Sequence, residues 1–318
     1  MRFLDLHCDT VTECRKRRLS VKCNPLHLDF DRGAAFSEWV QTFAVWIPDE
    51  LRGDAAWSYY LDNAAFFECE CSESGATVCR TYDEIRNALA DGKCAAVFAV
   101  EGGAVLGGRI NRLYELYRIG VRILTLTWNA ENELGFGCQS AGGRLKPFGT
   151  DVVRAMDELG MIADVSHLDR VGFYDVLDTS RRPVLASHST SAAVLERTRK
   201  DGTDKVFSVR RALDDGQIRA LSERGGLIGL NFCRSFLGDS PDDGFDAALR
   251  HASHILEIGG ESVLAVGSDF DGCEIHPELA GIEYIPRLYA YFTEHGFSRV
   301  LCEKIFFENG LHFFKNVL

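Results

Sequence analysis

The stretch AAVFAVEGG, residues 95–103, decides the fold that the sequence predicts. Its first six residues are apolar without alternation, and a glutamate and two glycines follow them. A short apolar run that ends in turn residues indicates a β-strand buried on both faces. Strands of this kind belong to parallel sheets, because helices cover both sides of such a sheet.

Seven further runs repeat the pattern along the chain. Between the runs lie segments with apolar residues three and four positions apart and Gly or Asp near their ends, which predicts helices over 54–70, 108–120, 149–160 and 244–260. Eight strands that alternate with helices predict an α/β fold, a parallel (β/α)8 TIM barrel. The seven runs are FLDLH (3–7), QTFAVWI (41–47), RILTLTWN (122–129), MIADVSH (161–167), RPVLASHS (182–189), GGLIGLNF (225–232) and SVLAVGSDFDG (262–272).

An open, doubly wound sheet is the alternative fold. Such sheets usually have fewer strands, and here no glycine-rich phosphate loop follows the first run. The length of 318 residues fits one large domain as well as two, and the repeated units favour a single domain over 1–318. Two longer inserts, near 11–40 and over 189–215, follow strand ends, where barrel enzymes build their substrate loops.

The composition of the chain indicates which binding partners to expect and in which cellular compartment the protein lies. A net charge of -12 argues against nucleic acid, because phosphate binding needs a basic face. The start MRFLDL lacks the long apolar run of a signal peptide, and no stretch is long and apolar enough for a membrane span. Eleven scattered cysteines then fit reduced thiols, so we expect a cytoplasmic protein.

Polar side chains gather at the ends of these apolar runs. If the barrel forms, they all lie on its C-terminal rim, the face where barrel enzymes place their active sites. His7 and Asp9 are two positions apart in an extended segment and should share a face, with Cys8 turned away. The six residues are three imidazoles and three carboxylates from five strands: His7, Asp9, Glu101, His167, His188 and Asp269.

This set of side chains indicates a metal centre. Crowded acidic and imidazole groups would repel one another or stay unsatisfied without a cation. Nitrogen and oxygen ligands without thiolate suit zinc or a similar divalent ion. The ligands His7, Asp9, Glu101, His167 and His188 are too many for one four-coordinate ion with an open position. They fit two ions that share a bridging carboxylate and a hydroxide.

The sequence resembles the renal (membrane) dipeptidase family, zinc metallopeptidases of the amidohydrolase superfamily. The matching motifs run in order from residue 3 to residue 272 and cover most of the chain. They are DLHCDT, AVEGG, LTLTWN, PFGTDVVRAMDELGMIADVSH, PVLASHS, RRALDDGQI, GGLIGLNF and GSDFDG.

The resemblance implies a distorted barrel with two zinc ions that hydrolyses dipeptides, and it suggests a homodimer. By motif, His7 and Asp9 would hold one zinc, His167 and His188 the other, and Glu101 would bridge them. Asp269 would accept a proton from the attacking hydroxide and pass it to the departing amine. Arg211 in RRALDD best matches the arginine that binds the substrate carboxylate, with Arg210 and Arg199 as alternatives.

One position departs from the family pattern. Relatives of the renal type carry a histidine at the end of strand four, where this chain has Trp128. An indole N–H donates a hydrogen bond but cannot take up a proton. Trp128 is therefore either a contact to the substrate carbonyl or an aromatic wall of the pocket. Asn129 is a second candidate donor to the oxyanion.

Two other functions stay open from sequence. A lactonase, phosphotriesterase or other amidohydrolase could use the same metals. Some of these relatives bridge the ions with a carboxylated lysine on strand four, and RILTLTWN contains no lysine. A metal-binding protein without activity is the other alternative. Outside the rim, His251 and His254 lie three apart in a predicted helix, and we expect both on its solvent side.

Overall fold

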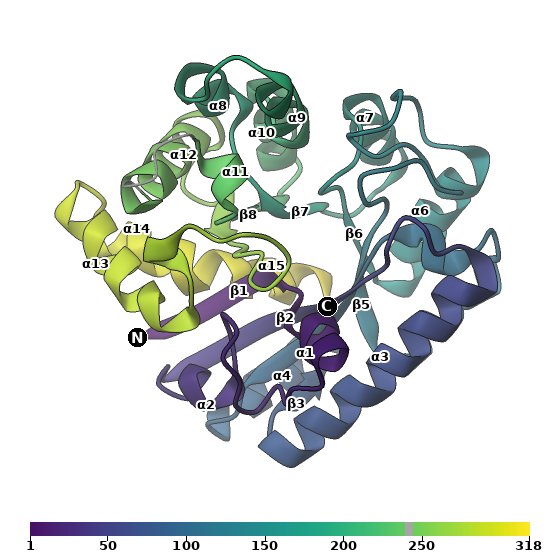
Figure 1. Cartoon of the computed structure of the whole chain (residues 1–318), viewed down its shortest axis with the longest axis horizontal. Helices are drawn as coiled ribbons and strands as arrows, with labels where there is room; N and C mark the ends of the chain where they lie inside the picture. Colours follow the sequence, from purple (N-terminus) through teal and green to yellow (C-terminus); the bar gives the residue numbers. More distant parts are fainter. Residues whose placement is uncertain (239–243) are drawn as a thin grey trace.

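The computed structural model describes residues 1–238 and 244–318, and in them eight parallel strands close into a barrel inside a layer of helices (Figure 1). Around the barrel the order is β1, β2, β4, β5, β6, β7, β8 and β9, and β9 pairs with β1. All eight predicted strands are present. Their bounds are β1 Arg2–Cys8, β2 Glu38–Trp46, β4 Ala95–Glu101, β5 Val121–Thr125, β6 Ile162–Asp164, β7 Leu185–Ser189, β8 Leu227–Leu230 and β9 Leu264–Val266.

A ninth strand, β3 (Thr77–Cys79), was not predicted. It pairs with the first half of β4, where Thr77 lies opposite Ala95. On the same side of β4, β5 pairs with the second half, from Phe98 onward. Three residues, two of them only partly buried, are too few to show a strand pattern in sequence.

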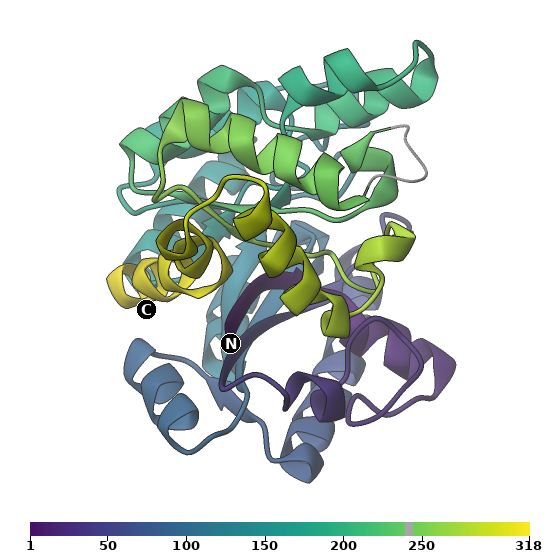
Figure 2. The same cartoon turned by 90° about the vertical axis from the view of Figure 1, so that its left-hand side faces the viewer.

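The predicted helices are confirmed, and shorter ones occur in the loops. Figure 2 shows the helices stacked outside the strands. The helices are α1 Thr10–Arg17, α2 Phe30–Gly33, α3 Gly53–Ser74, α4 Tyr82–Ala90, η1 Gly103–Leu106, α5 Ile110–Ile119, α6 Pro147–Leu159, α7 Arg170–Thr179, α8 Ala192–Thr198, α9 Thr203–Arg211, α10 Asp215–Glu223, α11 Arg234–Leu237, α12 Gly244–Gly259, η2 Pro277–Leu279, η3 Ile282–Tyr284, α13 Ile285–Glu294, α14 Arg299–Glu303, η4 Lys304–Glu308 (a π-helix) and α15 Asn309–Val317.

The C-terminal helix α15 closes the end of the barrel at which the strands begin. Asn309 donates a hydrogen bond from Nδ2 to the carbonyl oxygen of Leu264, the first residue of β9. Phe313 and Phe314 pack in the same buried cluster as interior strand residues such as Leu4 and Val97. The site must therefore lie at the opposite end.

The two inserts form helices at the end of the barrel where the strands finish. The insert after β1 carries α1 and α2, and the insert after β7 carries α8 and α9. No helix in the described part of the chain is both long enough and apolar enough to span a bilayer.

Candidate metal centre

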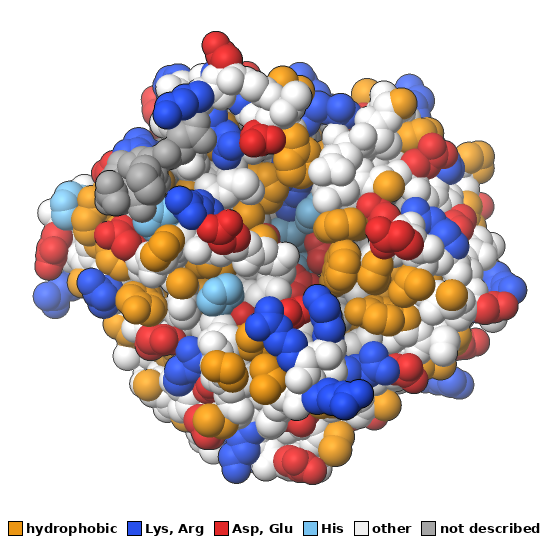
Figure 3. Space-filling view, in the orientation of Figure 1, with side chains coloured by type: hydrophobic (Ala, Val, Ile, Leu, Met, Phe, Trp, Pro, Cys, Tyr) orange, Lys and Arg blue, Asp and Glu red, His pale blue; other side chains and the backbone are white. Residues whose placement is uncertain are grey.

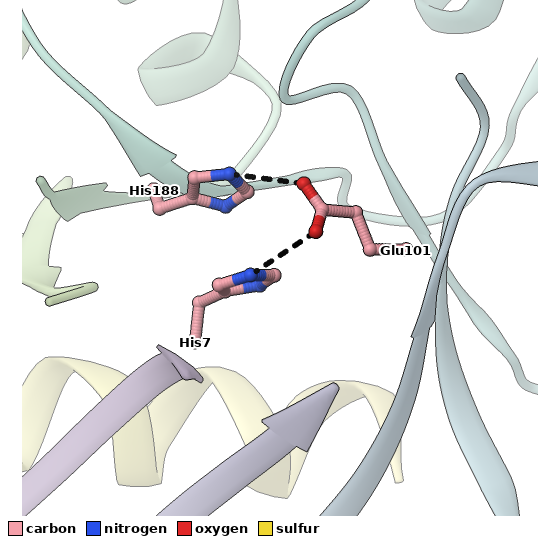
Figure 4. A group of neighbouring side chains, drawn as sticks. All are labelled: His7, Glu101 and His188. Atoms are coloured by element: carbon pink, nitrogen blue, oxygen red, sulfur yellow. Dashed lines mark ion pairs between the residues drawn. The ribbon is translucent and has the colours of Figure 1, made fainter. Parts of the chain in front are cut away.

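The six predicted side chains meet at the C-terminal end of the barrel. The carboxylate of Glu101 lies at their middle, with Oε1 2.9 Å from His167 Nε2 and 3.4 Å from His188 Nε2. Its Oε2 lies 3.7 Å from His7 Nε2, and His7 Nε2 lies 3.3 Å from Asp9 Oδ2. Figure 4 shows His188 above His7, both on the same side of the Glu101 carboxylate and each from a different strand; their rings stack at 3.8 Å between centroids.

His7 faces this centre because β1 contains a bulge. Leu4 and Leu6 pack in the interior cluster, so strict alternation would turn His7 outward. However, Asp5 pairs with Gln41 and Cys8 pairs with Phe43, so β1 has one residue more than β2 over this span. A bulge re-aims the following side chains, and it directs both Leu6 and His7 inward. Cys8 packs in the outer core, as predicted.

His188 depends on the same device in β7. Leu185 packs inside the barrel and Ala186 outside, so regular alternation would also turn His188 outward. Ala186 pairs with Ile228 and Ser189 with Leu230, which again leaves one extra residue on the strand that carries the histidine. The bulge therefore brings the imidazole to Glu101.

Left-handed backbone positions orient two further site residues. His167, three residues beyond the end of β6, has a φ of 65°, and Asp269, beyond β9, has a φ of 62°. Residues other than glycine seldom adopt this conformation, and it costs of order 1–3 kcal/mol where the surroundings impose it. Such positions concentrate at functional sites.

Two buried aspartates that sequence reasoning missed hold these irregular segments. Asp5 accepts hydrogen bonds from the backbone N–H groups of His7 and Ser268, at 3.3 and 2.8 Å. Asp164 accepts from the N–H groups of Ser166 and Ser187, at 3.0 and 2.9 Å. Each aspartate interrupts an apolar strand run, and this signal could have identified both from sequence.

Burial and neighbouring charge separate the ionisation of the three histidines. Burial lowers the pKa of His167 and His188 well below the usual value, and Arg211 and His7 lower both further. For His7, burial acts in the same direction, but Asp9 and Glu101 outweigh it and raise the pKa well above the usual value. Burial, then Asp9, raises the pKa of Glu101 to about 7.

The donor set fits two divalent cations. His167 Nε2 and His188 Nε2 lie 2.9 Å apart, and neutral imidazoles are the form that binds metal. Asp9 Oδ1 is buried and has no hydrogen-bond partner among the described residues. Such an oxygen is costly unless a cation satisfies it. His7, Glu101 and His188 present ligand atoms within 4.8 Å of one another, and so do His7, Asp9 and Asp269.

A cavity of about 420 Å³ opens over this centre. Figure 3 shows the hollow near the middle of the face in view, with histidine and acidic side chains inside it. Asp9, Glu101, His167 and Asp269 line the cavity. Its wall also carries Trp46, Trp128, Phe207 and Phe236, so a polar floor is combined with aromatic walls.

The predicted substrate-binding residues differ in their surroundings. Trp128 lines the cavity and packs edge-on against Trp46 at 5.0 Å between ring centroids. Asn129 also lines the cavity, but its Oδ1 lies 2.9 Å from His167 Nδ1 and so orients that imidazole. Arg211 is buried behind His188 and donates to the His188 carbonyl oxygen at 2.9 Å.

The prediction that His251 and His254 both face solvent is wrong for His251. Its side chain is fully buried in α12, where Nδ1 accepts a hydrogen bond from the Ser191 N–H at 3.1 Å. Nε2 lies 3.3 Å from the Leu237 carbonyl oxygen. The helix packs against the segment after β7, and periodicity alone did not reveal this contact. His254 pairs with Asp215 at 2.7 Å.

Comparisons with known proteins point the same way as the geometry. A family model described as membrane dipeptidase (peptidase family M19) matches residues 1–318. An uncharacterised protein in the pqqA 5′ region of Klebsiella pneumoniae is 30% identical over 254 residues, which are 76% of this chain and 88% of that protein. Dipeptidase tcpJ of Claviceps purpurea is 29% identical over 241 residues, 74% of this chain but only 54% of the longer relative.

A solved structure extends the likeness to three dimensions. It is a metallopeptidase from Rhodobacter sphaeroides, liganded with a phosphinate mimic of the dipeptide L-Ala-D-Ala. The two structures agree with a TM-score of 0.89 at 26% sequence identity, over 100% of this chain and 99% of that one.

Proposed function

Because the chain belongs to the membrane dipeptidase family, peptidase family M19, it is a metal-dependent dipeptidase, and we propose that it works with two zinc ions and accepts dipeptides with a D-residue at the C-terminus. The convergence of three imidazoles and two carboxylates on one point is the observation that carries the proposal of two ions. The relative solved with an L-Ala-D-Ala mimic supports the substrate class.

In this proposal each half of the centre comes from one side of the barrel. His7 and Asp9 would hold one ion, His167 and His188 the other, and Glu101 would bridge them. When bound, the ions would supply Lewis-acid polarisation of the scissile carbonyl and a water molecule of lowered pKa. The nitrogen and oxygen donor set supports zinc.

Asp269 would move the proton. It is buried at the cavity, and Asn231 Nδ2 donates a hydrogen bond to its Oδ2 at 3.0 Å. Burial, together with the charge of Asp9, raises the pKa of Asp269. A raised pKa suits a group that must take a proton from water and return it to the leaving amine.

The remaining roles concern the substrate. Arg211 would bind the substrate carboxylate, supported by its buried Nε, which has no hydrogen-bond partner in the described part of the chain. The indole of Trp128 would form a wall of the pocket or donate a hydrogen bond to the substrate carbonyl oxygen. Asn129 would orient the imidazole of His167 or donate a hydrogen bond to the oxyanion. A single domain over 1–318, a homodimer and a cytoplasmic location stay predictions.

The first experiment is metal analysis of the purified protein, followed by a screen of dipeptides with L- or D-residues at the C-terminus. We expect two equivalents of zinc per chain and hydrolysis of dipeptides. Lactones and phosphotriesters serve as matched controls for other amidohydrolase chemistry. One equivalent of metal in a fully active enzyme would contradict the two-ion centre, and faster turnover of a lactone would contradict the substrate class.

A further inference from the structure

Two cysteines lie beside Asp269 at the wall of the cavity. Sulfur atoms of Cys233 and Cys273 and a carboxylate oxygen of Asp269 all lie within 4.8 Å of one another. Cys233 is buried, Cys273 is partly exposed, and all three residues line the cavity. Neither thiol belongs to the ligands proposed for the two zinc ions.

The backbone holds this thiol pair in place. Cys233 forms an antiparallel bridge with Ile275, and the Arg234 N–H donates to the Glu274 carbonyl oxygen at 2.9 Å. Asn231 links the backbone of Cys233 to the carboxylate, since its Oδ1 accepts from the Cys233 N–H at 2.5 Å while its Nδ2 donates to Asp269. The three side chains are therefore fixed by the segments that follow β8 and β9.

We propose that Cys233, Cys273 and Asp269 form a third cation site, specific for a thiophilic divalent ion such as Cd²⁺ or zinc in excess, and that its occupation inhibits the enzyme. Two sulfur ligands and one oxygen ligand suit a four-coordinate soft ion, with water in the fourth position. Each thiol loses its proton on binding, so one ion replaces two protons.

Inhibition follows from the place of Asp269 in the site. A carboxylate oxygen that ligates a cation no longer accepts a proton from water at that oxygen, and the ion also narrows the cavity beside the metal centre. This part of the inference rests on the proposed role of Asp269. Binding of the cation depends only on the geometry of the three side chains.

The test uses full-length protein already loaded with zinc, with the exposed Cys23 and Cys69 replaced by serine. Cd²⁺ is added in steps, and the ultraviolet charge-transfer band from thiolate to cadmium is recorded together with dipeptidase activity. Because the proposed zinc ligands contain no sulfur, the band reports on thiol sites alone. A phosphine reductant keeps the thiols reduced without adding a competing thiol.

We expect the band to saturate at one equivalent while activity falls in parallel. Cys233→Ser and Cys273→Ser should each lose the band at one equivalent and stay active at that cadmium concentration. Cys302→Ser, in a buried cysteine of α14, is the matched control and should keep both the band and the inhibition.

Three results would overturn the inference. The first is that the parent protein shows no charge-transfer band. The second is that the band persists in Cys233→Ser. The third is that cadmium inhibits the enzyme without producing the band, which would place cadmium at the zinc centre. Zinc released during the titration is measured to recognise that last case. A protein that gives the cysteine-dependent band but hydrolyses no dipeptide would retain the cation site and contradict the proposed function instead.

Discussion

The direction of single side chains at this centre depends on unusual backbone at their own positions. His167 and Asp269 have positive φ, and His7 and His188 lie in strand bulges. Asp9 lies beyond the end of β1, with φ of -104° and ψ of 13°, so the predicted extended conformation is wrong at this residue. It still reaches His7, and the predicted pairing of the two side chains is confirmed for a different reason.

Asp269→Asn tests the proton transfer. The amide keeps the size of the carboxylate but cannot take up a proton at neutral pH, so kcat should fall by about 10²–10⁴-fold. Elemental analysis should still find the metal content of the parent protein. Unchanged turnover would remove Asp269 from the mechanism, and lost metal would mean that it acts as a ligand.

His251 should make stability depend on pH. Burial lowers the pKa of His251 from 6.5 to about 3. Between these pH values the imidazole is therefore protonated in the unfolded chain and neutral in the folded chain. The contribution of His251 to the free energy of unfolding is complete above pH 6.5 and is lost as pH falls toward 3. Between pH 7 and pH 5 the free energy of unfolding should fall by about 2 kcal/mol for this reason.

His251→Gln provides the comparison. The amide retains one acceptor for Ser191 and one donor for Leu237. Denaturant unfolding at pH 7 and pH 5, on samples of equal metal content, should show a smaller loss for the variant than for the parent. Equal losses for both proteins would show that His251 does not contribute to the pH dependence.

At the scale of elements, β1 and β7 each contain a bulge near the C-terminal end, and a buried aspartate accepts hydrogen bonds from the backbone there. Asp5 serves the side of β1 and β9, and Asp164 serves the side of β6 and β7. Asp164 Oδ2 also accepts from the hydroxyls of Thr125 and Ser187, at 2.5 and 2.6 Å. These buried carboxylates satisfy N–H groups that the irregular strands leave without ladder partners.

Asp164→Asn should weaken one half of the metal centre. The amide nitrogen cannot accept the hydroxyl hydrogen bonds, so the segments that carry His167 and His188 lose part of their support. Loss of such outer contacts typically lowers metal affinity about 10–100-fold. Competition with a chelator should show one weakened ion and one unchanged ion, whereas equal affinity for both ions would contradict this role.

At the scale of the whole molecule, the two ends of the barrel have separate tasks. The end at which the strands begin is closed by α15, whose Phe313 and Phe314 pack in the interior cluster. The other end carries the six polar side chains and the cavity. Stability and chemistry are therefore separated along the barrel axis, as is usual for barrel enzymes.

Phe314→Ala should show this separation. The side chain is fully buried, and its loss should lower the free energy of unfolding by about 3–5 kcal/mol. Metal content and kcat should stay at parent values well below the unfolding temperature. Lys315→Ala, at an exposed position of the same helix, is the control and should change stability by less than about 0.5 kcal/mol. Loss of metal in Phe314→Ala would mean that the end of the barrel closed by α15 also supports the site.

From the amino-acid sequence alone, the eight strands, the closed barrel and the six polar side chains that meet at its C-terminal rim could be predicted. Apolar runs of this length have few alternatives to buried parallel strands, and side chains at the ends of such strands meet on one rim. Each of the six residues identified in this way lies close to at least one of the others.

Tertiary structure decided how those side chains face one another and what surrounds them. Alternation along a strand would turn His7 and His188 outward, and only pairing with neighbouring strands reveals the extra residue that turns them inward. The packing of His251 and the thiols beside Asp269 likewise join segments that are far apart in sequence. Such contacts depend on long-range packing, which a local pattern does not record.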